Sequence, residues 1–306
     1  EISAADGGIA NLMAANNSPV LAALREHGTA AQKRRFFPKL TTGEMIGCIA
    51  LTEPHTGSDA AAIRTRAERR GDYFVLNGHK SFITAGRRAG VVMIVAVTDP
   101  DAGKRGISTF LTPTDNPGYK VLREEAKLGH RTNDTCAIAF EDMMVPATDL
   151  LGAEGRGLGI ALANLSAGRI GVAAQAVGGA RAAFEAALNY AQEREAFGKP
   201  IIEHQAVAFR LADMATKIEV GRQMYLHAAQ IHDSGAPSLK EASMAKLFAS
   251  DMAETVASDA LQTFGGYGYL EDFPVAKILR DVRVYRIYEG TNDIQKIVIS
   301  RALASS

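Results

Sequence analysis

The 306-residue chain contains no tryptophan, only two cysteines and no clustered histidines. Cys48 and Cys136 lie in apolar stretches without a CxxC motif, so we expect buried free thiols in a reducing compartment rather than a disulfide. The histidines have no HxxxH or HExxH spacing. The sequence therefore predicts no metal site.

Neither sign of charge is in excess, because Lys plus Arg and Asp plus Glu number 34 each. We therefore expect no strong field toward nucleic acid or an anionic membrane. No run approaches the roughly 20 uninterrupted apolar residues of a membrane helix, so we expect no membrane span. The chain opens at Glu1 within a helical pattern, without a signal-like segment, which favours a cut or processed start.

Three regions differ in their patterns. Residues 1–43 suggest short helices, with Ser18-Pro19 as one helix start and a capping box from Thr29 to Gln32. Residues 44–152 contain short β-rich runs, and Asn77-Gly78 predicts a hairpin turn between two strands. The expected strands are MIGCIAL, YFVLNGHKSFIT, VVMIVAV, ISTFLT and CAIAF.

Residues 153–306 show helical periodicity almost throughout. The expected helices span residues 157–193, 202–233, 238–264, 274–285 and 292–304. Long amphipathic helices with short links predict an antiparallel bundle. Thr291 suits the N-cap of the last helix, with Glu289 and Gly290 in the preceding turn.

Several motifs carry residues suited to chemistry. They are IALTEPHTGSDA (49–60), YFVLNGHKSFITAG (73–86), AGRIG (167–171), EREAFGKPIIEHQ (193–205), QTFGGYGYLEDFP (262–274) and YEGTNDIQ (288–295). Each alone has a plain structural explanation: turn residues in the first, a surface charge at Arg194, a solvated turn at Glu289. Together, in this order and at these distances, they resemble the acyl-CoA dehydrogenase family, nearest its short-chain, butyryl-type members, from about residue 18 to 304.

This resemblance implies an α+β multidomain fold with FAD as cofactor. The expected domains are a partial N-terminal helical domain (1–43), a middle β-barrel-like domain (44–152) and a C-terminal four-helix bundle (153–306). In the family, FAD lies between the last two domains and is usually shared between subunits of a homotetramer. Against that pattern, the chain lacks most of the N-terminal helical domain.

The resemblance also implies the FAD contacts. The matching residues are Ile49, Ala50, Leu51, Thr52, Gly57, Ser58, Phe82, Ile83, Thr84, Arg194, Phe197, Gln205, Gln262, Gly265, Gly266, Thr291 and Asp293. Phe82 stands where family members commonly have tryptophan, and the Thr84 hydroxyl matches the one that approaches flavin N5. Arg194 suits the pyrophosphate, because a guanidinium offers paired donors in a fixed fork.

Glu289 matches the general base of the family. The resemblance implies substrate contacts at Ser58, Ser166, Arg169 and Gly290. Near relatives often carry Asp at the position of Ser166. Other members carry the catalytic glutamate immediately before the arginine that matches Arg169, but here that residue is Gly168, which leaves Glu289 as the candidate base.

The reaction implied is α,β-dehydrogenation of a short-chain acyl-CoA to the trans-2-enoyl-CoA, with hydride transfer to flavin N5. Electron-transferring flavoprotein is the expected electron acceptor, and the cytoplasm is preferred over the mitochondrial matrix as the location. Two alternatives stay open: an acyl-CoA oxidase that passes electrons to O2, and a flavin-free scaffold descended from such enzymes.

Overall fold

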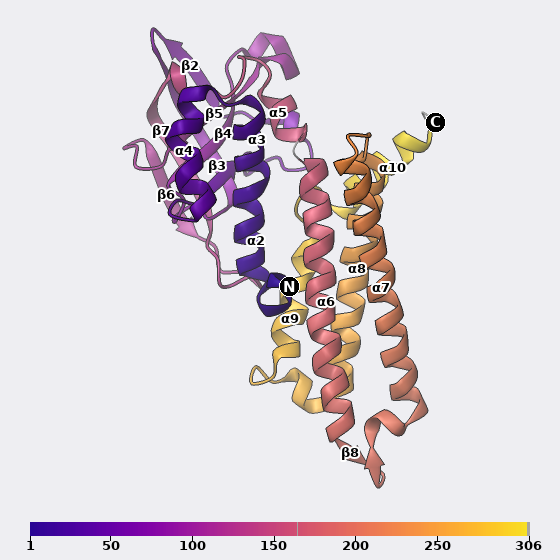
Figure 1. Cartoon of the computed structure of the whole chain (residues 1–306). Coiled ribbons are helices and arrows are strands. Elements are labelled where there is room, and N and C mark those ends of the chain that lie inside the picture. Colours follow the sequence, from indigo (N-terminus) through magenta and orange to yellow (C-terminus); the bar gives the residue numbers. More distant parts are fainter. Residues whose placement is uncertain (164, 305–306) are drawn as a thin grey trace. The chain divides into compact units, whose positions relative to one another are not determined.

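The computed structural model describes residues 1–163 and 165–304, the side chains of 165 and 166 excepted. These residues form two compact units. Figure 1 colours the chain by sequence position, from indigo at the N-terminus to yellow at the C-terminus. A β unit comprises Leu12–Ala126 and Asn133–Leu165. A helical unit comprises Glu1–Asn11, Lys127–Thr132 and the residues from Ser166 onward. The domain boundaries expected near residues 43 and 152 stay a prediction.

The β unit is built on a mixed sheet in the order β1-β4-β2-β3-β7-β6, with β5 paired to β4. Its strands are β1 (Gly47–Ala50), β2 (Arg66–Arg70), β3 (Tyr73–Thr84), β4 (Val91–Val97), β5 (Ile107–Pro113), β6 (Tyr119–Glu124) and β7 (Thr135–Pro146). All five expected runs form strands, and YFVLNGHKSFIT forms the single strand β3. The sequence missed β2 (RAERR) and β6 (YKVLRE), because their mostly exposed polar residues give little apolar signal.

Strand β4 is central because both of its faces are covered. Val92, Ile94 and Ala96 pack into a cluster with residues of β3 and β7. Val91 and Met93 pack into a second cluster with apolar residues of α3 (Ala22–His27) and α4 (Ala30–Thr42). Double burial explains why the strand is a continuous apolar run rather than an alternating one.

The N-terminal helices confirm the expected local signals. Helices α1 (Ile2–Ala5) and α2 (Gly7–Ala15) precede a kinked segment, η1 (Asn16–Leu21). Ser18 has extended dihedral angles within this segment, so the helix restarts at Pro19. Thr29 and Gln32 form the predicted capping box of α4. Cys48 and Cys136 are buried free thiols in the β unit.

The predicted hairpin at Asn77-Gly78 is wrong. Strand β3 continues through both residues, and its register against β7 shifts between Leu76 and Gly78. Gly78 has φ of +154°, and the Asn77 side chain accepts a hydrogen bond from the backbone N–H of Asp142. The dipeptide marks a bulge in a long strand, an alternative use of glycine that a local motif cannot distinguish from a turn.

The helical unit consists of long helices around an alanine-rich core. Its main helices are α6 (Leu165–Glu193), α7 (Gln205–Asp233), α8 (Leu239–Phe264), α9 (Pro274–Val282) and α10 (Asn292–Ala304), as expected from the sequence. Ala173, Ala176, Ala180, Ala183 and Ala187 follow one face of α6 and are fully buried. Small residues on this face let the neighbouring helices approach closely.

The segment Gly157–Glu193, formed by α5 (Gly157–Ala163) and α6 around residue 164, is 37 residues long and meets the length and composition of a membrane span. About half of its most apolar window, 47%, is buried inside the structure. The core helix of a bundle meets the same criteria. The expectation that the chain has no membrane span stays a prediction.

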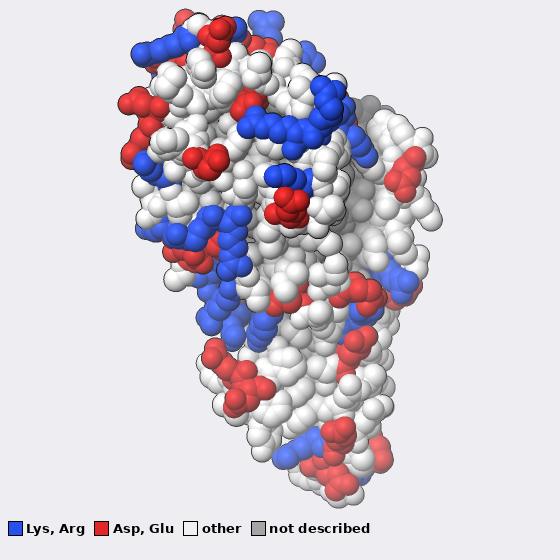
Figure 2. Space-filling view, turned by 60° about the vertical axis from the view of Figure 1, so that its left-hand side comes forward, with Lys and Arg blue, Asp and Glu red and all other residues white. Residues whose placement is uncertain are grey.

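Charges of both signs occur in neighbouring positions on the face shown in Figure 2. Surface pairs such as Arg69–Glu154 and Arg87–Glu124, each at 3.4 Å, belong to the β unit. Exposed pairs of this kind contribute little to stability. They keep the surface polar without creating a strong local field.

One ion pair of the β unit is fully buried and fixes the loop after β1. Lys80 Nζ donates to Glu53 Oε1 at 2.8 Å and to the carbonyl oxygens of Leu51 and Val95. The Glu53 carboxylate also accepts from the backbone N–H groups of Arg64 and Thr65. The ammonium group and both carboxylate oxygens thus all have hydrogen-bond partners. A buried ion pair needs such partners to be stable. The pair anchors the segment that carries Thr52 to β3.

We expect Lys80→Met to lower the free energy of unfolding by about 3–5 kcal/mol, because it leaves the Glu53 carboxylate buried and unpaired. Urea denaturation of the flavin-free protein measures this change. Lys120→Met, at an exposed position of β6, is the control and should stay within about 0.5 kcal/mol of wild type. A Lys80 variant no less stable than the control would contradict a structural role for the pair.

Candidate active site

The turn before α10 presents a carboxylate on an unusual backbone. Glu289 and Gly290 both have positive φ, of 55° and 84°. The turn ends at Thr291, whose Oγ1 accepts from the Ile294 N–H at 3.4 Å and whose carbonyl accepts from Gln295 N at 3.0 Å. The predicted N-cap is therefore confirmed. Left-handed backbone at a glutamate is costly, and such strain clusters at functional sites.

The Glu289 side chain is half-buried and lies near two cations, Arg169 and Lys246. Its Oε1 is buried and has no hydrogen-bond partner among the described residues. Burial raises the pKa of Glu289 from 4.5 to about 7, against the opposing effects of Arg169 and Lys246. A carboxylate with a pKa near neutrality can take up a proton from a substrate and release it again.

Helix α6 makes room for this carboxylate at Gly168. A Cβ atom at Gly168 would overlap Oε1 of Glu289, so only glycine fits while Glu289 occupies this place. The next residue, Arg169, is buried, and its Nη1 donates to Ser243 Oγ at 3.2 Å. The expected association of Arg169, Gly290 and Glu289 is seen within the helical unit. The side chain of Ser166 lies outside the described residues.

Three buried polar residues beside Glu289 were missed by the sequence analysis: Lys246, Asn292 and Gln295. Lys246 Nζ and Gln295 Nε2 each donate to the Gly290 carbonyl at 2.8 Å. A signal for Lys246 exists in the sequence, since it is the single charge in the apolar stretch between Glu241 and Asp251. Its burial and its partner could not be predicted without the packing of α8 against α10.

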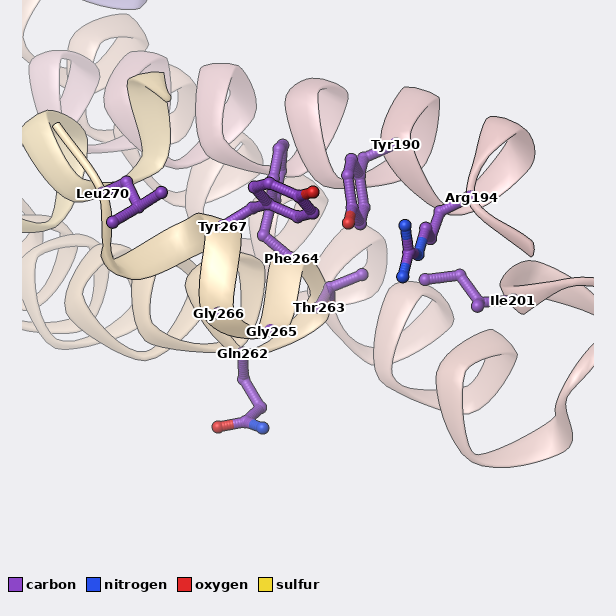
Figure 3. A pocket seen from close by; sticks show the side chains of 10 residues that line it. All are labelled: Tyr190, Arg194, Ile201, Gln262, Thr263, Phe264, Gly265, Gly266, Tyr267 and Leu270. Carbon is purple, nitrogen blue, oxygen red and sulfur yellow. The ribbon is translucent and has the colours of Figure 1, made fainter. Parts of the chain in front are cut away.

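A second feature of the helical unit is a hollow of about 460 Å³ at the end of α8 (Figure 3). Its lining residues are Tyr190, Arg194, Ile201, Gln262, Thr263, Phe264, Gly265, Gly266, Tyr267 and Leu270. The Arg194 guanidinium lies 5.9 Å from the centre of the Tyr267 ring. Figure 3 shows the Gln262 side chain pointing away from Arg194 and Tyr190. The hollow thus combines a cation, aromatic rings and the backbone of two glycines.

Gly265 and Gly266 fit the close approach of another molecule. A Cβ at either position would meet no atom of the described chain within 4 Å. Packing inside the chain therefore does not require glycine at Gly266. At Gly265 the positive φ of 60° is by itself a reason for glycine. Arg194 and these glycines suit a pyrophosphate-containing cofactor, because the phosphates need paired donors and close backbone contact.

The remaining candidates of this region lie outside that hollow. Phe197 has 97% of its surface exposed at the tip of the hairpin β8 (Glu195–Ala196) and β9 (Lys199–Pro200), with φ of 54°. Gln205, at the start of α7, is exposed too. Asp293, also exposed, pairs with Lys296 at 3.5 Å. Thr291 contributes its hydroxyl to the N-cap of α10.

The candidates of the β unit lie on the β1 loop and the end of β3. Ile49 and Ala50 end β1, and Leu51 and Thr52 follow directly. The Thr52 carbonyl accepts from Ser81 N at 2.8 Å, which places this loop beside the residues Phe82, Ile83 and Thr84. Gly57 and Ser58 are exposed in the same loop.

Phe82 sits on strained backbone at an irregularity of β3. Its φ is 60°, its side chain is 67% exposed, and the β3–β7 register shifts between Lys80 and Ile83. Among the described residues, six other than glycine have positive φ, and Phe82, Phe197 and Glu289 are three of them. Backbone strain that persists at an exposed aromatic residue is consistent with a ring positioned to stack on a planar ligand.

No group of three or more His, Cys, Asp or Glu in the described part of the chain could hold a metal ion.

Family models match nearly the whole chain. The N-terminal, middle and C-terminal domains of acyl-CoA dehydrogenase match residues 1–44, 48–143 and 155–304. An acyl-CoA dehydrogenase of Bacillus subtilis is 49% identical over 90% of this chain and 73% of its own length.

Solved structures agree with this match. Butyryl-CoA dehydrogenase from Megasphaera elsdenii superimposes with a TM-score of 0.97 at 41% identity, covering 99% of this chain and 80% of its own. A chain in a structure described as the electron transferring flavoprotein of Acidaminococcus fermentans gives a TM-score of 0.98 at 44% identity, with 99% and 80% coverage.

The mixed half-barrel sheet, the helical bundle and the matches over all three regions define a flavin-dependent oxidoreductase. The chain belongs to the acyl-CoA dehydrogenase family. The expected fold class, enzyme class and FAD cofactor are thereby confirmed.

We expect Glu289→Gln to stabilise the flavin-free protein increasingly as the pH rises. The folded-state pKa of Glu289, about 7, lies above its ordinary 4.5, so the stabilising effect of the neutral form is present at low pH and lost as the pH rises through 7. The amide is neutral throughout. The stability difference should therefore grow between pH 5 and 8 toward an order of 3 kcal/mol, since one pKa unit corresponds to about 1.4 kcal/mol.

Thermal melts across this pH range measure the effect, with exposed Glu193→Gln as the control. A difference between Glu289→Gln and wild type that does not change with pH would contradict the raised pKa.

Proposed function

We propose that this enzyme converts a short-chain acyl-CoA to the trans-2-enoyl-CoA, with Glu289 as the base that removes the α-proton. The observation that supports this role most strongly is the buried, unpartnered Glu289 Oε1 against the surface of Gly168. A carboxylate without a hydrogen-bond partner keeps its lone pairs free for a substrate proton. Neither acyl-CoA oxidase activity nor a flavin-free scaffold is favoured by the relatives of the chain.

Proton abstraction needs more than a base, because the α-proton of a thioester is weakly acidic. We assign polarisation of the thioester carbonyl to the backbone N–H of Glu289, a fixed donor in the left-handed turn. Gly290 lets the acyl chain lie against the backbone, and the environment that raises the pKa of Glu289 brings it into the range of a working base. When bound, FAD supplies the acceptor for the hydride of the β-carbon.

We assign FAD contacts in each unit separately, by the match of its residues to the family. In the helical unit, Arg194 supplies paired donors for the pyrophosphate of FAD bound to a neighbouring subunit, and Gly265 and Gly266 permit its close approach. In the β unit, Phe82 and Thr84 present a ring and a hydroxyl to the flavin. Phe197 and Gln205 are exposed on the hairpin and the α7 start, which suits contact with FAD of a neighbouring subunit in a homotetramer.

The substrate and the electron acceptor follow from the relatives. The butyryl-CoA specificity in the name of the Megasphaera elsdenii enzyme supports a short acyl chain. The Acidaminococcus fermentans match supports electron-transferring flavoprotein as the partner that reoxidises the flavin. The relatives include both bacterial and mitochondrial enzymes, and we keep the cytoplasm as the proposed location. Ser58, Ser166 and Arg169 are the proposed CoA or acyl contacts.

We expect Glu289→Gln to reduce flavin reduction by butyryl-CoA by about 100- to 10,000-fold, the contribution typical of a general base. Anaerobic stopped-flow absorbance of the holoprotein measures the rate, and wild-type enzyme with butyryl- and palmitoyl-CoA tests the chain length. The variant should still bind FAD and acyl-CoA, because the amide keeps the size of the side chain. A rate within a few-fold of wild type would place the base elsewhere.

We expect Arg194→Ala to weaken FAD retention by about 10- to 100-fold, because hydrogen bonds to charged groups contribute roughly 1.5–3 kcal/mol each. Titration of the apoprotein with FAD, followed by quenching of flavin fluorescence, measures the dissociation constant. Arg222→Ala, at an exposed position of α7, controls for loss of a surface charge. Equal affinities of the two variants would remove Arg194 from the FAD site.

A further inference from the structure

Lys246 is a buried cation whose position is not explained by an ion pair. Its side chain is fully buried, with 0% exposure, in the middle of α8. Nζ donates to the Gly290 carbonyl at 2.8 Å and to Asn292 Oδ1 at 2.9 Å. Within the described residues, no carboxylate lies within salt-bridge distance of it. Burying an ammonium group in this way is costly, so stability alone does not account for a lysine here.

The carbonyl that Lys246 binds belongs to the residue after the proposed base. Gln295 Nε2 donates to the same oxygen at 2.8 Å and to the Glu289 carbonyl at 3.3 Å. Two donors therefore fix the peptide unit between Gly290 and Thr291, and Gln295 also contacts the one between Glu289 and Gly290. Because Glu289 and Gly290 both have left-handed backbone, this turn needs external contacts to persist.

The contacts continue into a polar network between α8 and the start of α10. Asn292 Nδ2 donates to Ser250 Oγ and Asp251 Oδ1, both at 2.9 Å. Asp251 in turn pairs with Arg286 at 2.6 Å, in η7 (Arg283–Arg286). Lys246 is thus held by partners that are themselves fixed, which suits a residue that sets the geometry of a neighbour.

We propose that Lys246 is a positioning residue for the base: it holds the Gly290 carbonyl, and its charge favours the ionised form of Glu289. This inference rests on the proposed function, because it takes Glu289 as the base. Lys246 does not touch the reacting atoms through any contact described. It acts on the backbone and the field around Glu289.

The charged and titratable groups around Glu289 give the sign of the electrostatic effect. Arg169 on α6 and Lys246 on α8 both lower the pKa of Glu289, against the larger effect of burial. Tyr288 adjoins the carboxylate and is neutral, since burial raises its pKa well above 10. Burial lowers the pKa of Lys246 itself to about 8, with Asp251 and Arg286 acting in opposite directions. Removing the Lys246 charge must therefore raise the pKa of Glu289.

Three variants separate the hydrogen bond from the charge. Lys246→Met removes both, Lys246→Gln keeps an N–H donor without the charge, and Gln295→Met removes the second, neutral donor to the Gly290 carbonyl. Lys296→Met, at an exposed position of α10, is the matched control. Glu289→Gln is measured beside them, so that a failure of the proposed base is recognised independently.

The measurement is the rate of flavin reduction by butyryl-CoA in the FAD-loaded variants between pH 5.5 and 9, with butyryl-CoA affinity measured separately. We expect Lys246→Met to lose about 100-fold in rate, as misplacement of a reacting group by about 1 Å does. Its half-maximal rate should move to higher pH by roughly one unit or more, as expected for loss of a nearby opposite charge. Lys246→Gln should show the same pH shift with a smaller loss of rate. Gln295→Met should lose rate without the shift, and acyl-CoA affinity should change little in each case.

A Lys246→Met variant that keeps the wild-type rate and pH profile overturns the proposal, provided that Glu289→Gln abolishes reduction. If both Lys246 variants lose rate with an unchanged pH profile, the Lys246 charge does not act on Glu289. That result overturns the assignment of Lys246 as a positioning residue for the base. Where neither Lys246 variant folds, Gln295→Met decides the issue: a wild-type rate there would contradict the proposal that fixing the Gly290 carbonyl sets the rate. If Glu289→Gln itself reduces its flavin normally, the proposed function fails, and this inference fails with it.

Discussion

The site depends on one carboxylate, that of Glu289, whose Oε1 is buried near two buried cations, on backbone that is itself strained. Burial favours the protonated form, whereas Arg169 and Lys246 favour the ionised form, and the balance places the pKa near 7. Either influence alone would make a poor base. Without the cations the group would be protonated at neutral pH, and without burial its pKa would be too low for it to take an α-proton.

The rest of the helical unit maintains this balance. Gly168 leaves the volume that the carboxylate fills, and the alanine-lined face of α6 brings that helix close enough to its neighbours for the fit to matter. Helix α8 contributes Lys246, and α10 contributes Gln295, so the turn between η7 and α10 is held from two helices at once. In the β unit, the buried Glu53–Lys80 pair has a comparable task, because it fixes the loop that carries Thr52. Each unit thus uses a buried lysine to hold the backbone of a loop that carries a proposed site residue.

The sequence predicted the features that depend on local chemistry. The capping box at Thr29, the N-cap at Thr291 and the long helices all follow from spacing within one segment. Glu289 was identified as the candidate base because its motif resembles that of the family. Features set by packing were missed: exposed polar strands β2 and β6 lack an apolar pattern, and Asn77-Gly78 forms a bulge because β3 pairs with β7 through it. Lys246 stands out in the sequence as a lone charge, but its burial and role could not be predicted, because its partner is a backbone carbonyl 44 positions away.

The central claim is that Glu289 titrates near neutrality. Carbon-13 NMR of protein labelled at the glutamate carboxyl, compared between wild type and Glu289→Gln, isolates the resonance of this one group during a pH titration. The account predicts a midpoint near pH 7, well above the ordinary value of 4.5. A midpoint close to 4.5 would show that the carboxylate is solvated, and it would contradict both the buried base and the role of the cations around it.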